Sequence, residues 1–407
     1  MTSLSALPLL VRRALRQHAT ASALCVLLIA LAYGGFLAAW TVRGEAARAF
    51  SQSAGGFDAV LGARGSPLQL VLCALFHLEP APGSLEAADV EDLRQHPAVA
   101  HAIPIAVGDN YRGWRLVGAP VELFTDVDWL PGKKLSVQPG GRLFDPAREE
   151  AVAGAFAAKR LGLKPGDRIQ AFHGLDYNPA NAHDEFFTVT GILEPTGTPA
   201  DRAIWVPLAD LQHLPGHDPA KAEAVSAVLV QFRPTMRAAG FALDRLYNRQ
   251  GTRLTFAWPV AAVLAGLFDR FAWMDRVLGL GAAAAAALAS LCVLIALHSS
   301  LHARRREWAI LRAMGAPRRL LTTALVVEAG AIGALGAILG TGVFWIAGLV
   351  IAAVVRTQTG VLLDLAAWHP VLGWAPASMI ALCLAAGAWP AASAYANPVA
   401  ENLTPPT

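Results

Sequence analysis

Charged residues are scarce in this sequence. Asp, Glu, Lys and Arg make up 15% of its 407 residues, whereas soluble globular chains carry roughly 25%. Hydrophobic residues reach 55%, and the mean hydropathy is +0.44. This composition argues against a water-soluble enzyme and predicts that much of the chain lies in lipid.

Lysine is also scarce, and its positions exclude one catalytic motif. None of the five lysines precedes Ser or Thr, so the Gly-Lys-Ser/Thr of a phosphate-binding P-loop is missing. The Gly-x-Ser-x-Gly, His-Glu-x-x-His and Cys-x-x-Cys motifs are missing as well. We therefore predict no catalytic residue and no metal ligand on this chain, and no ATP hydrolysis by a P-loop.

The four cysteines exclude a disulfide framework in the polar part of the chain. Cys25, Cys292 and Cys383 lie in apolar stretches, and Cys73 stands alone outside them. A disulfide-stabilised outer domain would need at least two cysteines there.

Long intervals with almost no formal charge are what the sequence has instead. A helix that crosses a bilayer needs about 20 apolar residues, and four intervals exceed this length. The interval 320–355 contains a single charge, Glu328. As one helix it would be about 54 Å long at ~1.5 Å per residue, so it must tilt, bend or project beyond the membrane.

The distribution of charge predicts the orientation. Residues 43–276 carry a net charge of −3, and the rest of the chain carries +6, mostly arginine. Because arginine-rich segments stay in the cytoplasm, we predict an α-helical membrane protein with four transmembrane helices and a large mixed α/β extracytoplasmic domain inserted between helices 1 and 2. The predicted parts are the cytoplasmic N-terminus (1–16), helix 1 (17–42), the periplasmic domain (43–276), helix 2 (277–301), a cytoplasmic coupling loop (302–319), helix 3 (320–355), a short outer loop (356–369), helix 4 (370–394) and a cytoplasmic tail (395–407).

The first span could also be a signal peptide, because Ala47-Arg48-Ala49 resembles a cleavage tripeptide. Its apolar run is longer than the 7–15 residues of a signal peptide. We therefore favour an uncleaved anchor.

The outer domain has strand and helix patterns in alternation. Residues 186–193 and 225–232 are rich in β-branched and aromatic residues, which predicts strands. Residues 85–95 have helical spacing, and Pro195-Thr196-Gly197 predicts a turn. The apolar stretch 66–77 is too short to span a membrane; it is either a buried core helix, which we favour, or a helix for a partner or the membrane surface.

The histidines of the outer domain form no persuasive metal motif. His213 and His217 have the spacing of helical ligands, but Pro215 and Gly216 between them disfavour a helix. We interpret His183-Asp184-Glu185 as a solvated turn.

The loop 302–319 combines arginines with a helical apolar face. Trp308, Leu311 and Met314 recur at helical spacing, Gly315 fits a helix C-terminus, and Pro317 fits the start of the next helix. Anchoring of the topology would explain the arginines alone. An apolar face in the cytosol implies docking to another molecule.

This loop resembles the coupling signature of the FtsX/MacB-like ABC transporter permease family. The resemblance lies in residues 305–316, and it extends to the acidic, glycine-rich third span at 327–340 and the Asn-Pro-Val end at 397–403. Residues 96–99 and 161–167 are similar to family segments in the outer domain. The layout of one span, a large outer domain and three spans matches over the whole chain.

The resemblance implies a mechanotransmission transporter, in which a separate ABC ATPase subunit binds ATP and Mg²⁺ and this chain needs no cofactor. It implies a homodimer or heterodimer of permeases in the cell inner membrane, a periplasmic domain that can meet an adaptor or binding protein, and no nucleic acid. Docking to the ATPase would fall on Arg304, Arg305, Arg306, Glu307, Trp308, Leu311, Arg312, Met314 and Gly315.

The third span has two features of its own. Gly333, Gly336 and Gly340 give a flat face for close helix packing, either within the chain or between two permeases. Glu328 is an intramembrane carboxylate, which is costly unless it has a role. It is either functional, or it simply snorkels or accepts a hydrogen bond near the cytoplasmic end of the span.

Three functions fit this organisation. The first is export or extraction of an outer-compartment substrate, driven by the ATPase. The second is FtsX-like signalling or scaffolding, which controls periplasmic enzymes, and the third is release of lipoproteins as by LolC and LolE. A membrane-anchored enzyme is the least favoured, because no catalytic constellation is found.

Overall fold

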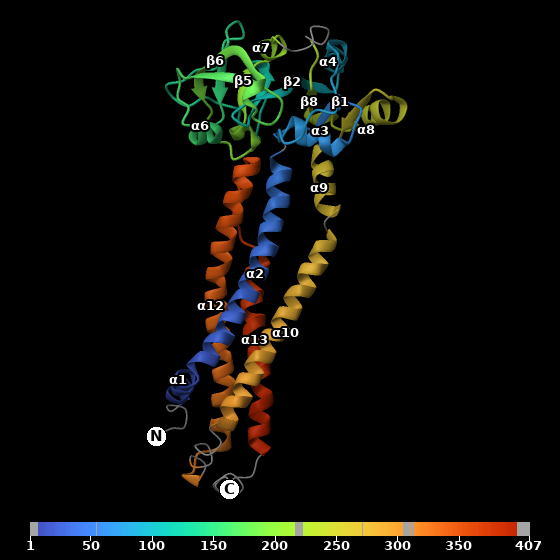
Figure 1. Ribbon diagram of the computed structural model, residues 1–407. Coiled ribbons are helices and arrows are strands. Elements are labelled where there is room, and N and C mark those ends of the chain that lie inside the picture. Colours follow the sequence, from blue (N-terminus) through green and yellow to red (C-terminus); the bar gives the residue numbers. More distant parts are fainter. Residues whose placement is uncertain are drawn as a thin grey trace. The chain divides into compact units, whose positions relative to one another are not determined.

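The computed structural model describes residues 7–53, 55–215, 223–270, 272–303, 310 and 313–396 (Figure 1). These residues form two units. The membrane unit comprises Met1–Gly44, Ala272–Ile351 and Asp364–Thr407, and the outer unit comprises Glu45–Phe271 and Ala352–Leu363. Two helices, α2 (Ala19–Gln52) and α12 (Arg318–Thr359), are continuous across the boundary in sequence.

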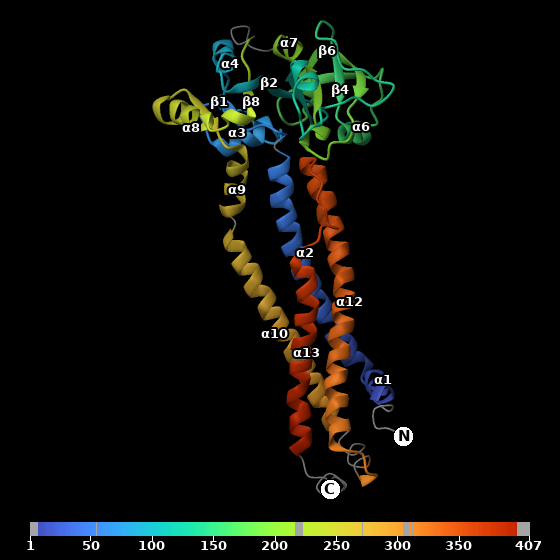
Figure 2. The same cartoon turned by 180° about the vertical axis from the view of Figure 1, so that it is seen from behind.

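Among the described residues of the chain, four helices are long and apolar enough to cross a membrane. The candidate spans are Ala19–Phe50, Arg276–Ser300, Thr322–Thr359 and Pro370–Trp389. They lie in α2, α10 (Ala272–Ala303), α12 and α13 (Pro370–Ala396), which run side by side in both views (Figures 1 and 2). The predicted fold class, with a mixed α/β domain between the first and second spans, is confirmed.

A short helix precedes the first span. Helix α1 (Leu7–Gln17) buries Val11 and Ala14 on one side, while Arg12, Arg13 and Arg16 lie within the same three turns. Apolar and basic residues on one short helix are typical of a helix that lies in the membrane interface. The sequence reasoning assigned no structure to this segment.

The core of the membrane unit is made of side chains from all four long helices. Ile29 and Leu37 of α2, Val293 of α10 and Phe344 of α12 are at most 1% exposed. Cys383 of α13 is fully buried in the same cluster. The remaining faces of these helices carry exposed Leu, Ile, Val and Trp side chains, as expected for surfaces that face lipid.

The outer unit is built on a sheet whose described strands are ordered β3-β7-β4-β6-β5-β2-β8-β1-β9. The strands are β1 Ala59–Ala63, β2 Val99–Tyr111, β3 Trp114–Ala119, β4 Glu150–Ala153, β5 Arg168–His173, β6 Ala182–Ile192, β7 Ile204–Pro207, β8 Ala227–Phe232 and β9 Leu254–Ala257. The strands predicted at 186–193 and 225–232 are confirmed as β6 and β8.

Strand β2 belongs to two parts of this sheet. Its first half, to Ile105, pairs with β8 in an antiparallel layer that continues through β1 to β9. Its second half pairs with β3 on one side and with β5 on the other. Because β3 also pairs with β7 and β5 with β6, the strands β2-β3-β7-β4-β6-β5 close into a ring. Closure removes the exposed sheet edges there.

Shorter helices cover these strands. They are α3 Pro67–Ala74, α4 Ala87–Arg94, α5 Glu122–Thr125, α6 Ala155–Leu161, α7 Leu208–Gln212, α8 Ala239–Asp244 and α9 Val260–Arg270, with 3-10 turns at Pro179–Asn181, Pro199–Arg202 and Pro234–Met236 and a π-helical turn at Arg245–Gln250. The helix predicted at 85–95 is confirmed as α4.

Two outer-domain predictions have clear outcomes. The apolar stretch 66–77 is a core helix, because Leu70, Val71 and Leu75 are fully buried in the main cluster. The interpretation of residues 183–185 as a solvated turn is wrong. These residues belong to β6, and His183 is buried. The polar residues at 183–185 suggested a turn, but they lie in a strand whose histidine faces the buried carboxylate of Asp109.

Candidate functional site

The predicted coupling segment is described only at its end. Arg304, Arg305, Arg306, Glu307, Trp308, Leu311 and Arg312 lie outside the described residues. Met314 donates a backbone hydrogen bond to the Ile310 carbonyl at 3.0 Å, which is one helical turn. Gly315 follows in the left-handed conformation (φ +98°) that ends many helices. The side chains of Ile310 and Met314 are exposed, at 45% and 72%, so apolar surface is available for docking.

The glycine face of α12 packs within the chain. A Cβ on Gly336 would lie 2.4 Å from Ile29 of α2, and one on Gly340 would lie 2.6 Å from Tyr33 of α2. A Cβ on Gly333 would lie 2.8 Å from Cys383 of α13. These glycines therefore bring α12 against two neighbouring helices of the same chain, which is the first of the two alternatives left open by the sequence.

Glu328 of α12 is 3% exposed and lies among helices of the membrane unit. A buried carboxylate needs polar or charged partners to offset its lost hydration, and Glu328 is not without a partner. Its burial shows that the side chain does not reach out toward water along the helix surface.

The outer end of α12 is part of the outer unit. Helix α12 ends at Thr359, and the next residue, Gly360, is left-handed (φ +78°) and so close to Thr198 that a Cβ would lie 3.2 Å from its carbonyl oxygen. Val361 is fully buried in the main core cluster. The backbone N–H of Leu362 donates to the Gly197 carbonyl at 3.2 Å. We call Gly360, Val361 and Leu362 the α12 anchor.

The loop that receives the α12 anchor is held by buried tryptophans and a carboxylate. Trp129 donates to Thr198 Oγ1 at 2.9 Å, and Trp205 donates to the Ala200 carbonyl at 3.2 Å. Asp201 accepts from the backbone N–H groups of Thr196 and Gly197, each at 2.8 Å. Burial raises the pKa of Asp201, and these hydrogen bonds oppose the rise.

Two other long segments reach the same core cluster. Phe50, in the last turn of α2, stacks on Phe76 at 5.1 Å between ring centroids and meets Phe268 of α9 edge-on at 5.9 Å. Val260 and Leu264 of α9 are buried in that cluster. Segments adjoining three of the membrane spans therefore converge on one core within the outer unit.

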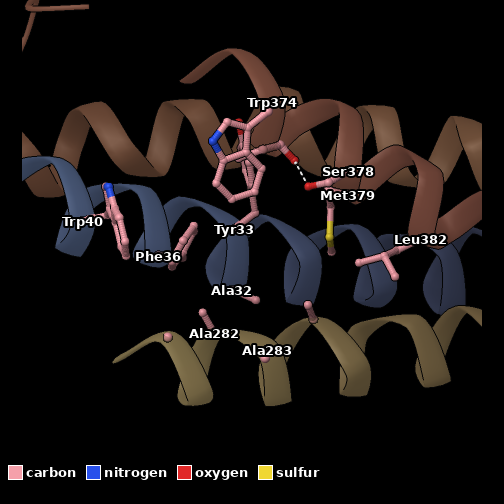
Figure 3. A pocket seen from close by; sticks show the side chains of 13 residues that line it. Ala32, Tyr33, Phe36, Trp40, Ala282, Ala283, Trp374, Ser378, Met379 and Leu382 are labelled. Carbon is pink, nitrogen blue, oxygen red and sulfur yellow. Dashed lines mark hydrogen bonds between the residues drawn. The ribbon is translucent and has the colours of Figure 1, made fainter. Parts of the chain in front are cut away.

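A cavity of about 310 Å³, open on one side, lies in the membrane unit between α2, α10 and α13. Its walls are almost entirely apolar (Figure 3). The Ser378 hydroxyl in its wall donates to the Ala375 carbonyl at 2.9 Å. Such a site suits an apolar chain better than a polar solute. Its larger lining side chains are Tyr33, Phe36, Trp40, Trp374, Met379 and Leu382.

These features define a class of protein: a membrane subunit with four spans, an inserted outer domain, and helices continuous between the two units. The MacB-like periplasmic core domain model matches residues 22–245, more than half of the chain, and the FtsX-like permease C-terminal model matches residues 279–398. The chain belongs to this MacB-like and FtsX-like family of ABC transporter permeases. The family consists of permease subunits and not of nucleotide-binding enzymes.

Comparisons with solved structures cover the outer domain. The extracellular domain of the noncanonical ABC-type transporter YknZ from Gram-positive bacteria is 21% identical, with a TM-score of 0.30 over 49% of this chain and 97% of that one. The periplasmic region of MacB from Actinobacillus actinomycetemcomitans is 12% identical, with a TM-score of 0.33 over 53% of this chain and 94% of that one. Among curated proteins, no match was found.

Sequence reasoning missed the α12 anchor and the cavity. The Pro195-Thr196-Gly197 turn was visible as a signal, but its partner Leu362, 165 residues later, was not. Gly360, directly after an apolar helix pattern, was the available sign of the helix end. The cavity has no sequence signal, because its alanines and aromatic residues are also what a packed helix bundle contains.

Proposed function

We propose that this chain couples ATP hydrolysis by a separate ABC ATPase subunit to conformational change in its own outer domain, and so moves a substrate that is handled outside the cytoplasm. The family match supports the permease role. The observation that carries the coupling is that α12, a single helix of 42 residues, belongs to both units and leads directly into the α12 anchor.

The mechanical argument rests on helix continuity. At ~1.5 Å per residue, α12 is about 63 Å long, twice the ~30 Å thickness of the hydrocarbon core. A continuous helix transmits displacement along its axis because every interior turn is hydrogen-bonded. A movement imposed near Gly315, where α12 is preceded by the predicted docking segment, would therefore reach Val361 in the outer core.

The partners proposed follow the family. Two permease chains and two ATPase subunits form the working unit, in a cell inner membrane with the large domain in the periplasm. ATP and Mg²⁺ bind to the ATPase subunits. The substrate is exported or extracted, and a periplasmic adaptor or binding protein is a further partner of the outer domain.

The apolar cavity favours one of the alternatives. The cavity has the apolar lining that an acyl chain of a lipoprotein or another lipid-linked substrate would need, whereas control of soluble enzymes calls for no such lining. Trp40 and Trp374 in its wall are aromatic residues of the kind that sit at the membrane interface. We therefore favour a substrate with at least one acyl or similarly apolar chain.

Docking of the ATPase is tested at Met314. Met314→Asp places a charge on exposed apolar surface at the end of the docking segment. Since a charge buried in an interface must be desolvated, we expect co-purification of a co-expressed partner ABC ATPase to fall at least tenfold.

The matched control is Met236→Asp, an exposed methionine of the outer domain (41% exposed), which should leave co-purification unchanged. Equal recovery of the ATPase with Met314→Asp and wild type would contradict docking at this segment.

A further inference from the structure

In the closed ring of strands of the outer unit, three polar side chains converge: those of Asp109, His173 and His183. His183 Nε2 lies 3.3 Å from Asp109 Oδ1, and His173 Nδ1 lies 3.2 Å from the same oxygen. All three potential ligand atoms lie within 4.8 Å of one another. The two imidazole rings are nearly perpendicular, at 79°, with centroids 5.8 Å apart.

The sheet brings these residues together from three adjacent strands. Asp109 of β2 and His173 of β5 are directly opposite each other in the antiparallel register, and His183 follows Ala182, the partner of Phe172, on β6. The β5–β6 ladder shifts register between Gln170 and Phe172, and β2 has a second shift, in its ladder with β3, between Val107 and Asp109. Such irregularities re-aim side chains and are frequent beside functional sites.

The hydrogen bonding of His183 determines where its lone pair points. His183 Nδ1 lies 2.9 Å from the Pro215 carbonyl oxygen, which can only accept, so Nδ1 carries the hydrogen. In the neutral ring the lone pair of Nε2 then faces the Asp109 carboxylate. Histidines that bind metals are oriented in this way, with the second ring nitrogen donating to a carbonyl or carboxylate.

We propose that Asp109, His173 and His183 bind one divalent first-row transition ion, of which Zn²⁺ is the expected one. A tetrahedral Zn²⁺ site with bonds of 2.0–2.1 Å holds its ligand atoms roughly 3.3 Å apart. The two N···O separations, 3.2 and 3.3 Å, match this spacing. Two imidazoles and one carboxylate suit zinc, copper or nickel, whereas calcium and magnesium prefer all-oxygen sites.

Burial and charge fit the same occupant. The side chains of Asp109 and His183 are at most 5% exposed, while that of His173 is 58% exposed, so solvent can supply the fourth ligand on one side. Glu185 is near enough for its charge to act on His183. Two carboxylates and two neutral imidazoles carry −2, which a divalent cation balances. The competing occupant is a proton, since Asp109 raises the pKa of His183.

Metal binding would strengthen the short pairing between β2 and β5, which closes the ring of strands. The pairing of β2 with β5 comprises only two residue pairs, Asp109 with His173 and Asn110 with Phe172. An ion bound by Asp109 and His173 would join the two strands through coordinate bonds at this point, and His183 would add β6. The site would therefore stiffen the part of the outer domain that contains the shared strand β2.

The test uses the full chain, purified in detergent through an affinity tag that contains no histidine. Bound metal is first removed with EDTA, and the EDTA is then removed by dialysis. Zn²⁺ is titrated in competition with a chromogenic chelator, and Co²⁺ is added separately as a spectroscopic probe. We expect one Zn²⁺ per chain, a visible Co²⁺ band typical of tetrahedral coordination, and a higher thermal unfolding midpoint with Zn²⁺.

The decisive variant is His173→Ala, which removes an exposed side chain and leaves the core intact. It should weaken Zn²⁺ binding at least tenfold and abolish the Co²⁺ band, and Asp109→Asn should do the same. His101→Ala, on the same strand β2, is the matched control and should bind as wild type does. Absence of stoichiometric binding, or binding that is equal in wild type and His173→Ala, would overturn the proposal and leave the cluster a proton-bridged pair of histidines.

Discussion

At the scale of single residues, the core of the outer unit contains a buried histidine, His77, whose protonation would oppose folding. His77 follows α3, is 3% exposed, and meets Trp205 edge-on at 5.6 Å. Burial lowers the pKa of His77 to about 4, and the charges of Arg115 and Arg202 act in the same direction. The folded outer unit therefore holds this imidazole neutral at pH values at which an exposed histidine is charged.

This has a consequence for stability. The unfolded chain takes up a proton at His77 below about pH 6.5, whereas the folded chain does so only near pH 4, so stability is lost as the pH falls between these values. The loss amounts to about 3 kcal/mol at most. His77→Phe keeps a ring against Trp205 and should flatten the pH dependence of the thermal unfolding midpoint over this window. The exposed His213→Phe should keep the wild-type slope, and an unchanged slope in His77→Phe would refute the assignment.

At the scale of elements, the packing of α12 depends on positions where only hydrogen fits. Gly340 meets Tyr33 of α2, and a Cβ there would also lie 2.9 Å from the Ala30 carbonyl oxygen. Two residues further, Gly342 has nothing within 4 Å of the same position. The backbone oxygen of Ala30 cannot move aside as the end of a flexible side chain can. We therefore expect Gly342 to tolerate substitution by a larger residue and Gly340 not to.

Alanine substitution on α12 separates these cases. Gly340→Ala should destabilise the membrane unit by about 1–3 kcal/mol, the usual cost of overpacking. Gly342→Ala should be neutral or stabilising by up to ~1 kcal/mol, because alanine favours helix more than glycine does. Thermal unfolding midpoints in the same detergent compare them, and equal midpoints would show that α2 and α12 do not pack at this glycine.

At the scale of the whole molecule, the proposed coupling depends on α12 being continuous where it passes from one unit to the other. Ala352 and Ala353 follow the boundary at Ile351. Glycine in a helix interior costs ~1 kcal/mol relative to alanine and loosens the backbone. The double variant Ala352→Gly/Ala353→Gly should keep ATPase binding and hydrolysis but lose the ATP-dependent change in hydrogen exchange of residues 194–203.

The matched control for this variant is Ala381→Gly/Ala385→Gly in α13, a helix that lies entirely in the membrane unit. It should retain the response to ATP. If the α12 variant responded to ATP as wild type does, transmission along α12 would be disproved, while docking at Met314 would stand on its own test.

The sequence by itself determined the four spans, the inserted domain and the family. Long apolar runs leave a helix no alternative in lipid, because every backbone group must be hydrogen-bonded there. The β-branched and aromatic residues of β6 and β8 likewise predicted strands, since such side chains pack well on a sheet. These are local properties, and the order of residues is sufficient to decide them.

Only the tertiary structure decided which distant residues meet. Val361 enters the outer core because the turn at Gly197 lies beside it, and Asp109, His173 and His183 converge because three strands with register shifts are neighbours in a closed ring. Sequence patterns report the face that a residue occupies within its own element. Which element lies opposite depends on the packing of the whole chain, and so the α12 anchor, the apolar cavity and the cluster of Asp109, His173 and His183 emerged from the fold alone.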